Sequence, residues 1–451
     1  MDSTIITFMN KTYETMNDFI KYVENEINLG NNLNVQDESN NTMLFILVNN
    51  TKLFYANRTK CVSTIKKLID AGVDLELRKD FYTVLEKAIL LGDIEIITIL
   101  IEAGANVNAQ DSKYGCTPLM TTIDNVRSYS YEIVKLLIKS GADLNLVDSS
   151  GHTVLMYIPL IIKGDYDITT YVRILLIAKM LIKSGASIDF EGCDRSVTVL
   201  MIASRFCHTP GVFNIAKLLI NSGANVNKQD SCGWTSLMIA SRHINSHSET
   251  GHYHYYKLIE KLIDAGANLD LQNYLGHTAL TYASRFSNKK SSLEVVKKLI
   301  DAGANINIKD KAGNTSLSYL VQYSNSLEVI QMVISKNATT NLLNFRSNTL
   351  LHLCAIGIKE NTSNYDILSF LETLDIDKTL KNNDGKIYLD YLELTWYVSK
   401  ICEICYSTNL PITILKCPCN CAKQCIECTY KINACCYCKK SFSHFETIRI
   451  V

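Results

Sequence analysis

Most of the chain repeats one short pattern of apolar and polar positions. In the copy at residues 134–141, Val134, Leu137 and Ile138 lie at positions i, i+3 and i+4, and Gly141 follows them. This spacing places the three apolar side chains on one face of a helix. Glycine adopts at little cost the left-handed backbone conformation that commonly ends a helix. The pattern therefore predicts an amphipathic helix that ends just before Gly141.

The phrase Leu-Ile, two further residues and Gly recurs along the chain. Seven copies cover residues 68–72, 100–105, 137–142, 181–186, 219–224, 262–267 and 299–304. A weaker copy covers residues 333–338, with Asn337 in place of Gly. A single helix of this kind cannot bury its apolar face alone, so recurrence predicts units that stack on their neighbours.

A second phrase, Asp-x-x-Gly-x-Thr-x-Leu, lies between the copies of the first. Clear examples begin at Asp148, Asp230 and Asp310. The Asp and Gly indicate a turn, and we expect the Thr to start a short helix. Including the related forms, these threonines are Thr42, Thr83, Thr117, Thr153, Thr198, Thr235, Thr278, Thr315 and Thr349.

Successive threonines are separated by 34 to 45 residues. This is a period of about 33 residues with loop insertions, and it resembles the period of ankyrin repeats. The longest gaps place insertions near residues 50–60, 163–170 and 244–254. The phrase also resembles the Thr-Pro-Leu-His sequence of ankyrin repeats, although Pro118 and His352 are the only residues that match its Pro and His.

Resemblance to ankyrin repeats implies a mostly α-helical solenoid. It would cover residues 37–400, with about nine repeats and a C-terminal partial repeat. Residues 1–36 would form a capping half-repeat with one apolar face, made by Phe19, Ile20, Val23 and Ile27. The partial repeat would begin at Asp384 and carry the apolar residues Tyr388, Leu389, Leu392 and Trp396. The family binds protein partners on its concave face, so we expect an unknown protein target there.

Three aromatic residues at the turn phrases are candidate partner anchors, namely Tyr114, Trp234 and Tyr274. In ankyrin arrays these turns line the binding face, and aromatic residues often contribute strongly to protein interfaces. The alternative is that each ring packs on the neighbouring repeat.

The chain changes character from Cys402 onward, where ten of its sixteen cysteines lie. Eight of them form three Cys-x2-Cys pairs and one Cys-x-Cys pair, at Cys402, Cys405, Cys419, Cys421, Cys425, Cys428, Cys435 and Cys438. A Cys-x2-Cys pair can direct both sulfurs at one tetrahedral ion, so eight ligands suffice for two structural zinc ions. A disulfide framework would use the same residues, but no secretory signal indicates an oxidising compartment.

This spacing resembles a RING finger at residues 401–451. In that family the ligands interleave as a cross-brace, which would assign Cys402, Cys405, Cys425 and Cys428 to one zinc ion. The other ion would be held by Cys419, Cys421, Cys435 and Cys438, with Cys417 as an alternative to Cys419. Cys421 stands where the family usually has His.

By the same resemblance, the finger would bind a ubiquitin-conjugating enzyme. The docking residues would be Ile404, either Tyr430 or Ile432, and Lys439, which stands where Arg is usual. The alternative is that the isoleucines fill a small core and Lys439 is a solvated charge. The tail, residues 441–451, has a strand-like pattern that would either complete a homodimer or fold back on its own finger.

Composition restricts the function further. The 451 residues carry zero formal net charge and no run of like charge, which argues against a nucleic-acid-binding protein. The longest apolar run, Ile174–Ile182, contains Lys179 and is too short to cross a membrane. We therefore expect no membrane partner and an intracellular, cytoplasmic protein.

Other chemistry-bearing residues receive structural interpretations. The six cysteines before the finger are scattered and are expected to be small core residues or free thiols. Four histidines near residues 243–254 match no familiar metal-site spacing, so they are interpreted as part of a polar loop. No paired carboxylates or Ser-His-Asp set occurs in a recognisable context.

These features are similar to ankyrin–RING ubiquitin ligases, including those of large DNA viruses. The resemblance implies an enzyme whose array binds a target and whose finger promotes ubiquitin transfer to lysine, with no catalytic residue forming a covalent intermediate. The alternative is a non-enzymatic ankyrin scaffold with a structural or dimerising zinc module.

Overall fold

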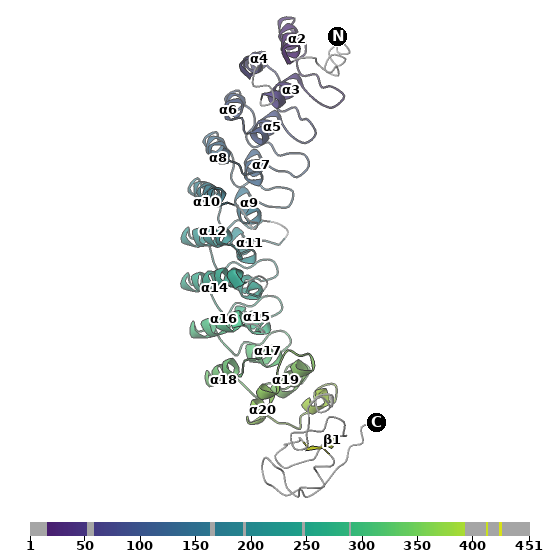
Figure 1. Ribbon diagram of the computed structural model, residues 1–451, viewed down its shortest axis with the longest axis vertical. Coiled ribbons are helices and arrows are strands. Elements are labelled where there is room, and N and C mark those ends of the chain that lie inside the picture. The colour runs from purple at the N-terminus through teal and green to yellow at the C-terminus, as the bar shows by residue number, and fades with distance from the viewer. Residues whose placement is uncertain are drawn as a thin grey trace. The chain divides into compact units, whose positions relative to one another are not determined.

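The computed structural model describes residues 16–51, 58–162, 167–192, 195–245, 249–287 and 290–392, and the pairs 412–413 and 424–425. The chain divides into two compact units, residues 1–308 and 309–451. The described repeats of both units are built from pairs of antiparallel helices joined by short loops (Figure 1). The expected mostly helical solenoid is confirmed for the described repeats.

The first helix of each pair begins directly after one of the nine predicted threonines. These helices are α3 (Met43–Asn50), α5 (Val84–Leu91), α7 (Pro118–Asp124), α9 (Val154–Ile161), α11 (Val199–Arg205), α13 (Ser236–His243), α15 (Ala279–Arg285), α17 (Ser316–Tyr323) and α19 (Leu350–Lys359). Thr117 is typical, because its hydroxyl accepts a hydrogen bond from the N–H of Met120. That bond satisfies a backbone donor that has no partner within the helix.

The second helix of each pair packs on the first or on its neighbour in the stack. These helices are α4 (Arg58–Asp70), α6 (Ile94–Glu102), α8 (Ser130–Lys139), α10 (Ile168–Lys183), α12 (Pro210–Asn221), α14 (Glu249–Asp264), α16 (Lys290–Asp301), α18 (Leu327–Ser335) and α20 (Tyr365–Glu372). In α8, Val134 and Leu137 are fully buried and Ile138 is half-buried, as its predicted face requires.

The predicted helix ends are also confirmed. Gly141 has φ 86° and its N–H bonds to the carbonyl of Ile138, which ends α8. Asn337 takes the same left-handed conformation, with φ 64°, where the sequence lacks the glycine. Asparagine is one of the few residues that tolerate this conformation, so the weaker copy keeps the same turn.

Among the described residues, one helix precedes the first pair. It is α2 (Met16–Asn28), which packs on α4 and buries Phe19, Ile20 and Val23, while Ile27 is half-buried. At the other end, the 3-10 helix η2 (Tyr388–Tyr391) packs on α19. Tyr388 is buried and Leu389 is 43% exposed, while Trp396 lies outside the described residues.

Within the first unit, the first helices stack in one column and the second helices in another (Figure 1). The long loops between repeats project on the side of the first helices. The described sheet structure is limited to β1 (Ile412–Thr413) and β2 (Gln424–Cys425), which pair antiparallel with Ile412 opposite Cys425. The domain boundaries at residues 36 and 400 stay predictions.

Candidate partner-binding surface

The turn phrases form hairpin tips that are bonded to one another along the stack. The Asp148 carboxylate accepts hydrogen bonds from the N–H groups of Ser150 and His152, at 2.8 Å each. The N–H of Ser149 then donates to the carbonyl of Tyr114 in the preceding tip, at 2.8 Å. The equivalent bond further along the stack runs from the N–H of Tyr274 to the carbonyl of Cys232 in the preceding tip. Bonds of this kind hold successive tips in a row beside the first helices.

The three predicted aromatic anchors differ in exposure. Tyr114 is 55% exposed and Tyr274 is 66% exposed, so both rings are accessible to a partner. Trp234 is half-buried and stacks on Tyr282 of the next repeat, with ring centroids 4.4 Å apart. Trp234 therefore agrees with the alternative interpretation, in which the ring packs on the neighbouring repeat.

Two further exposed rings were not singled out from the sequence. Phe81 is 39% exposed, and Phe345, in the second unit, is 72% exposed. Each follows directly after the first residue of a turn phrase, Asp80 or Asn344, so their position in the repeat was the available signal. The Nζ of Lys113 lies 5.2 Å from the Phe81 ring and 4.7 Å from the Tyr114 ring, which joins two tips by cation–π contacts.

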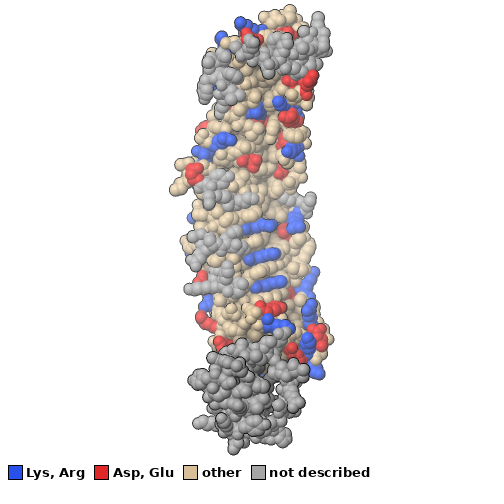
Figure 2. All heavy atoms as spheres, turned by 45° about the vertical axis from the view of Figure 1, so that its right-hand side comes forward, with Lys and Arg blue, Asp and Glu red and all other residues tan. Residues whose placement is uncertain are grey.

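Three arginines occupy one repeat position on consecutive first helices. Arg205 lies at the end of α11, Arg242 in the last turn of α13 and Arg285 at the end of α15, and all three are exposed. Since α11 packs on α13 and α13 on α15, the three positions follow one another along the stack. We call these residues the arginine ladder. Figure 2 shows Lys and Arg atoms in successive rows at the middle of this face.

The arginine ladder could have been found from the sequence. Each arginine ends an Ala-Ser-Arg triplet, at residues 203–205, 240–242 and 283–285. It lies seven residues after the threonine that starts the helix, as Arg205 does after Thr198. The composition hid this signal, because zero net charge over the whole chain says nothing about charge at one repeat position.

Aromatic rings accompany the arginine ladder. The guanidinium carbon of Arg242 lies 5.3 Å from the centre of the Trp234 ring, and that of Arg205 lies 5.8 Å from the Phe206 ring. Burial raises the pKa of Tyr282, while the positive charges of Arg242 and Arg285 lower it. The positive charges of both arginines therefore lie close enough to the Tyr282 hydroxyl to favour its ionised form.

Cys116 belongs to a polar cluster with no sign of nucleophilic activation. Its sulfur lies 3.2 Å from the Tyr157 hydroxyl, which in turn donates to Asp148 at 2.8 Å. Burial raises the pKa of Cys116 to about 11, so the thiol is protonated at neutral pH. A reactive cysteine needs a lowered pKa. Cys116 is thus a free structural thiol, as are the other described array cysteines, Cys61, Cys207, Cys232 and Cys354.

The histidines near the third insertion lie among aromatic side chains. The His254 ring lies 6.0 Å from Phe213 and 5.5 Å from Tyr253, and the His243 ring lies 6.5 Å from Tyr255. His247 lies outside the described residues. Among the described side chains, no group of three or more His, Cys, Asp or Glu lies close enough together to hold a metal ion.

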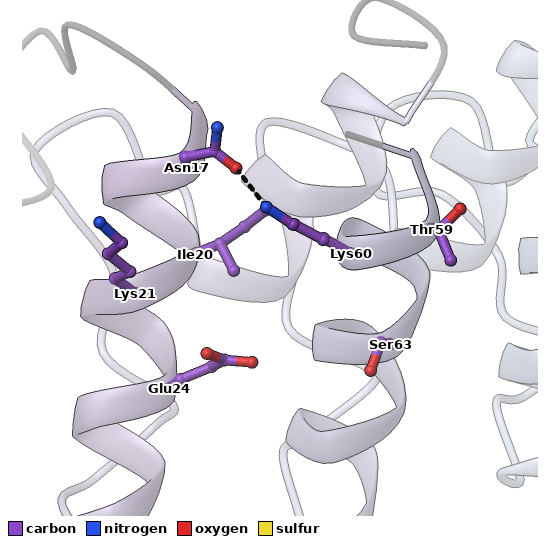
Figure 3. Close-up of a pocket in the computed structure, with 7 residues that line it drawn as sticks. All are labelled: Asn17, Ile20, Lys21, Glu24, Thr59, Lys60 and Ser63. Atoms are coloured by element: carbon purple, nitrogen blue, oxygen red, sulfur yellow. Dashed lines mark hydrogen bonds between the residues drawn. The ribbon is translucent and has the colours of Figure 1, made fainter. Parts of the chain in front are cut away.

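A polar groove runs between α2 and α4 (Figure 3). Its lining residues are Asn17, Ile20, Lys21, Glu24, Thr59, Lys60 and Ser63. Lys60 donates to Asn17 across it, at 3.3 Å, and the nearby Lys67 pairs with Glu24 at 2.7 Å. Lys60 and Lys67 are thus already engaged by side chains of α2, and the groove presents no nucleophile with an adjacent base.

The second helix α10 exposes an apolar stripe. Ile168, Val172 and Leu176 are 80%, 52% and 46% exposed and lie four residues apart. This spacing places them on one face of the helix. No helix in the described part of the chain is long and apolar enough to span a bilayer.

The predicted zinc ligands and docking residues lie outside the described residues, except that Cys425 is part of β2. The two zinc sites and the docking residues Ile404, Tyr430, Ile432 and Lys439 therefore stay predictions.

Comparison with known proteins covers most of the array. A family model described as ankyrin repeats, three copies, matches residues 53–148, 85–176, 119–230, 172–253, 211–310 and 247–344. No curated protein matches the chain.

Proposed function

Since the chain belongs to the ankyrin-repeat family, we propose that its array selects a protein target for a ubiquitin ligase module at its C-terminus. Ankyrin repeats bind protein partners, and the exposed tips and first helices supply a surface for one. In this proposal the array determines which protein is modified, and residues 401–451 promote transfer of ubiquitin to a target lysine. The protein would act in the cytoplasm.

The spacing of the C-terminal cysteines is the observation that carries this proposal. Eight cysteines in four close pairs occur within residues 402–438, whereas the array cysteines are scattered. Two ions held this way can stabilise about fifty residues that are too few to bury a sufficient core. One ion would be held by Cys402, Cys405, Cys425 and Cys428, and the other by Cys419 or Cys417 with Cys421, Cys435 and Cys438.

The described strands bring together the two ends of one cysteine-containing segment. Pairing of β1 with β2 brings Cys425 opposite Ile412. The segment that joins the strands contains Cys417, Cys419 and Cys421, so its two ends meet at one place. Bound zinc would supply only cross-links here, because four cysteine ligands leave no open position for a reactant.

Ile404, with Tyr430 or Ile432, would contact the conjugating enzyme, and Lys439 would donate a hydrogen bond to it. These residues would hold the ubiquitin-charged enzyme in a reactive arrangement, which accelerates transfer without a covalent intermediate on this chain. Lysine offers a single charged group and lacks the planar fork of arginine, so we expect weaker activation than with Arg at residue 439.

Self-ubiquitination of the purified full-length protein tests the proposal. The zinc-loaded protein is incubated with ubiquitin, activating enzyme and a panel of conjugating enzymes, and Cys402→Ser is the control. Formation of ubiquitin chains that depends on Cys402 is the expected result. The absence of transfer across the panel, with two zinc ions bound per chain, would refute a ligase.

A second candidate is a scaffold whose zinc module is structural or joins two copies. Cys421 in place of His and Lys439 in place of Arg favour it, since both depart from the pattern of active fingers. The strand-like tail at residues 441–451 would complete such a homodimer. Both forms of the scaffold require two bound zinc ions and no ubiquitin transfer, and the dimerising form also requires a dimer that is lost when the tail is removed.

A further inference from the structure

We propose that the arginine ladder binds an extended acidic segment of the target, with a carboxylate at every third residue. This inference rests on the proposed function only in that the array is the part that binds the target. The ladder consists of Arg205, Arg242 and Arg285, one from each of three consecutive repeats. All three are exposed on the side of the first helices.

Spacing selects the conformation of the partner. Packed helices lie about 8–10 Å apart, so arginines on α11, α13 and α15 recur at roughly that interval. A polyproline II segment has three residues per turn and rises about 3.1 Å per residue. Its residues i, i+3 and i+6 therefore point to one side at intervals of about 9 Å. A β-strand fits less well, since its side chains i and i+3 point to opposite faces.

Two arginines of the ladder, Arg205 and Arg242, are available for a negative partner. Among the described residues, the side chains of Arg205 and Arg242 form no ion pair with a carboxylate and instead lie over the rings of Phe206 and Trp234. Trp234 is itself fixed by stacking on Tyr282. Such contacts orient the planar guanidinium, which reduces the entropy lost when it binds a carboxylate through two hydrogen bonds.

The charge pattern ends abruptly on both sides of the ladder. The equivalent position is Leu160 in the repeat before Arg205 and Gln322 in the repeat after Arg285. Three positive positions in a row therefore match three carboxylates. In Figure 2 uncharged residues separate the successive rows of Lys and Arg atoms. A nucleic acid would be expected to need a longer basic surface, and the chain has zero net charge.

Binding of designed peptides to the full-length protein tests this inference. The probe is a fluorescein-labelled, proline-rich peptide with Glu at every third position, and fluorescence anisotropy gives its dissociation constant. The control peptide has the same length and composition, but its Glu residues are grouped in one stretch at every second position. We expect the period-three peptide to bind at least tenfold more tightly, and to weaken as salt is raised because charge pairs are screened.

Variants of the chain provide the second comparison. Replacing Arg205, Arg242 and Arg285 together with Ala is expected to abolish binding, and replacing them with Lys to weaken it about tenfold by removing the paired hydrogen bonds. Lys217→Ala removes an exposed charge from α12 and is the matched control. Circular dichroism verifies that each variant keeps the wild-type helical signal.

Three results would overturn the inference. They are equal affinity for the two peptides, binding that survives the triple Ala substitution, and tighter binding of single-stranded DNA than of the period-three peptide. Peptide binding requires no ubiquitin, so the two proposals can fail separately. A protein that binds the period-three peptide but transfers no ubiquitin would refute the ligase alone. A protein that transfers ubiquitin but does not bind this peptide would refute the acidic segment alone.

Discussion

At the residue scale, one repeat position carries both structural and ionisable side chains. Three residues after the helix-starting threonine, most repeats have Met, Thr or Ser, whereas α5 has Glu86 and α19 has His352. The Nε2 of His352 lies 3.0 Å from the carbonyl of Lys386, which only accepts, so Nε2 carries the proton. Its Nδ1 then accepts from Thr349, and the ring joins a helix start to the next tip.

Glu86 is a buried carboxyl group that forms no ion pair with a described residue. One of its oxygens accepts a hydrogen bond from the N–H of Thr83 at 2.8 Å, and the other has no partner in the described structure. Burial raises the pKa of Glu86 to about 7, although the Thr83 hydrogen bonds and Arg78 lower it. The folded protein therefore binds this proton at pH values where the unfolded chain, with a pKa of about 4.3, has released it.

The free energy of unfolding should consequently fall as the pH rises from about 4.3 to about 7, and change little through Glu86 above that. Glu86→Gln keeps an oxygen for Thr83 and removes the titration. We expect this variant to be more stable than the wild type at pH 8, by up to about 3 kcal/mol, and similar to it at pH 4.5. Denaturant unfolding at several pH values measures the difference. An unchanged pH profile in the variant would contradict the assignment.

At the element scale, the starts and ends of helices were predictable because they depend on local chemistry. Thr117 starts α7 through a bond to its own first turn, and Gly141 ends α8 through its own backbone conformation. Contacts between repeats were less visible in the sequence. The stacking of Trp234 on Tyr282 joins residues 48 positions apart, and nothing in either phrase specifies it. The arginine ladder likewise requires alignment of three units.

Gly92 shows how one helix end depends on the next repeat. It ends α5 with φ 64°, and a Cβ atom placed there would lie 2.0 Å from the Tyr129 ring. Gly104 is a matched control, since it has φ 93° and open space around the same position. Both glycines supply the left-handed conformation, but only Gly92 is also covered by a side chain.

Alanine substitution separates these two contributions. We expect Gly104→Ala to lower the free energy of unfolding by about 1–2 kcal/mol, through the backbone conformation alone. Gly92→Ala should cost about 1–3 kcal/mol more, because the Tyr129 ring has to move. Urea denaturation compares the variants, and adding Tyr129→Ala to Gly92→Ala should recover part of that extra loss. Equal costs at the two glycines would show that Tyr129 adapts freely.

At the scale of the whole molecule, the array and the proposed C-terminal module would depend on different forces. Each described repeat buries apolar residues against its neighbours, as Val134 and Leu137 of α8 do, so its stability requires no metal. The C-terminal module would obtain its folding energy from zinc. With eight cysteine ligands and about fifty residues, it is too short to bury a sufficient core without the ions. Removal of zinc should therefore affect one part of the chain and not the other.

Chelation tests this separation in the intact protein. Treating it with a strong zinc chelator should release two zinc ions per chain, expose the C-terminal thiols to alkylation and abolish self-ubiquitination. The helical circular dichroism signal and binding of the period-three peptide should stay within about 10% of the untreated values, because the array is held by apolar contacts between repeats. Parallel loss of helical signal and zinc would mean that the module also stabilises the array. A different result would be that the chelator releases no zinc and that the C-terminal cysteines resist alkylation even without it. This result would indicate a disulfide framework and remove the basis for a ligase.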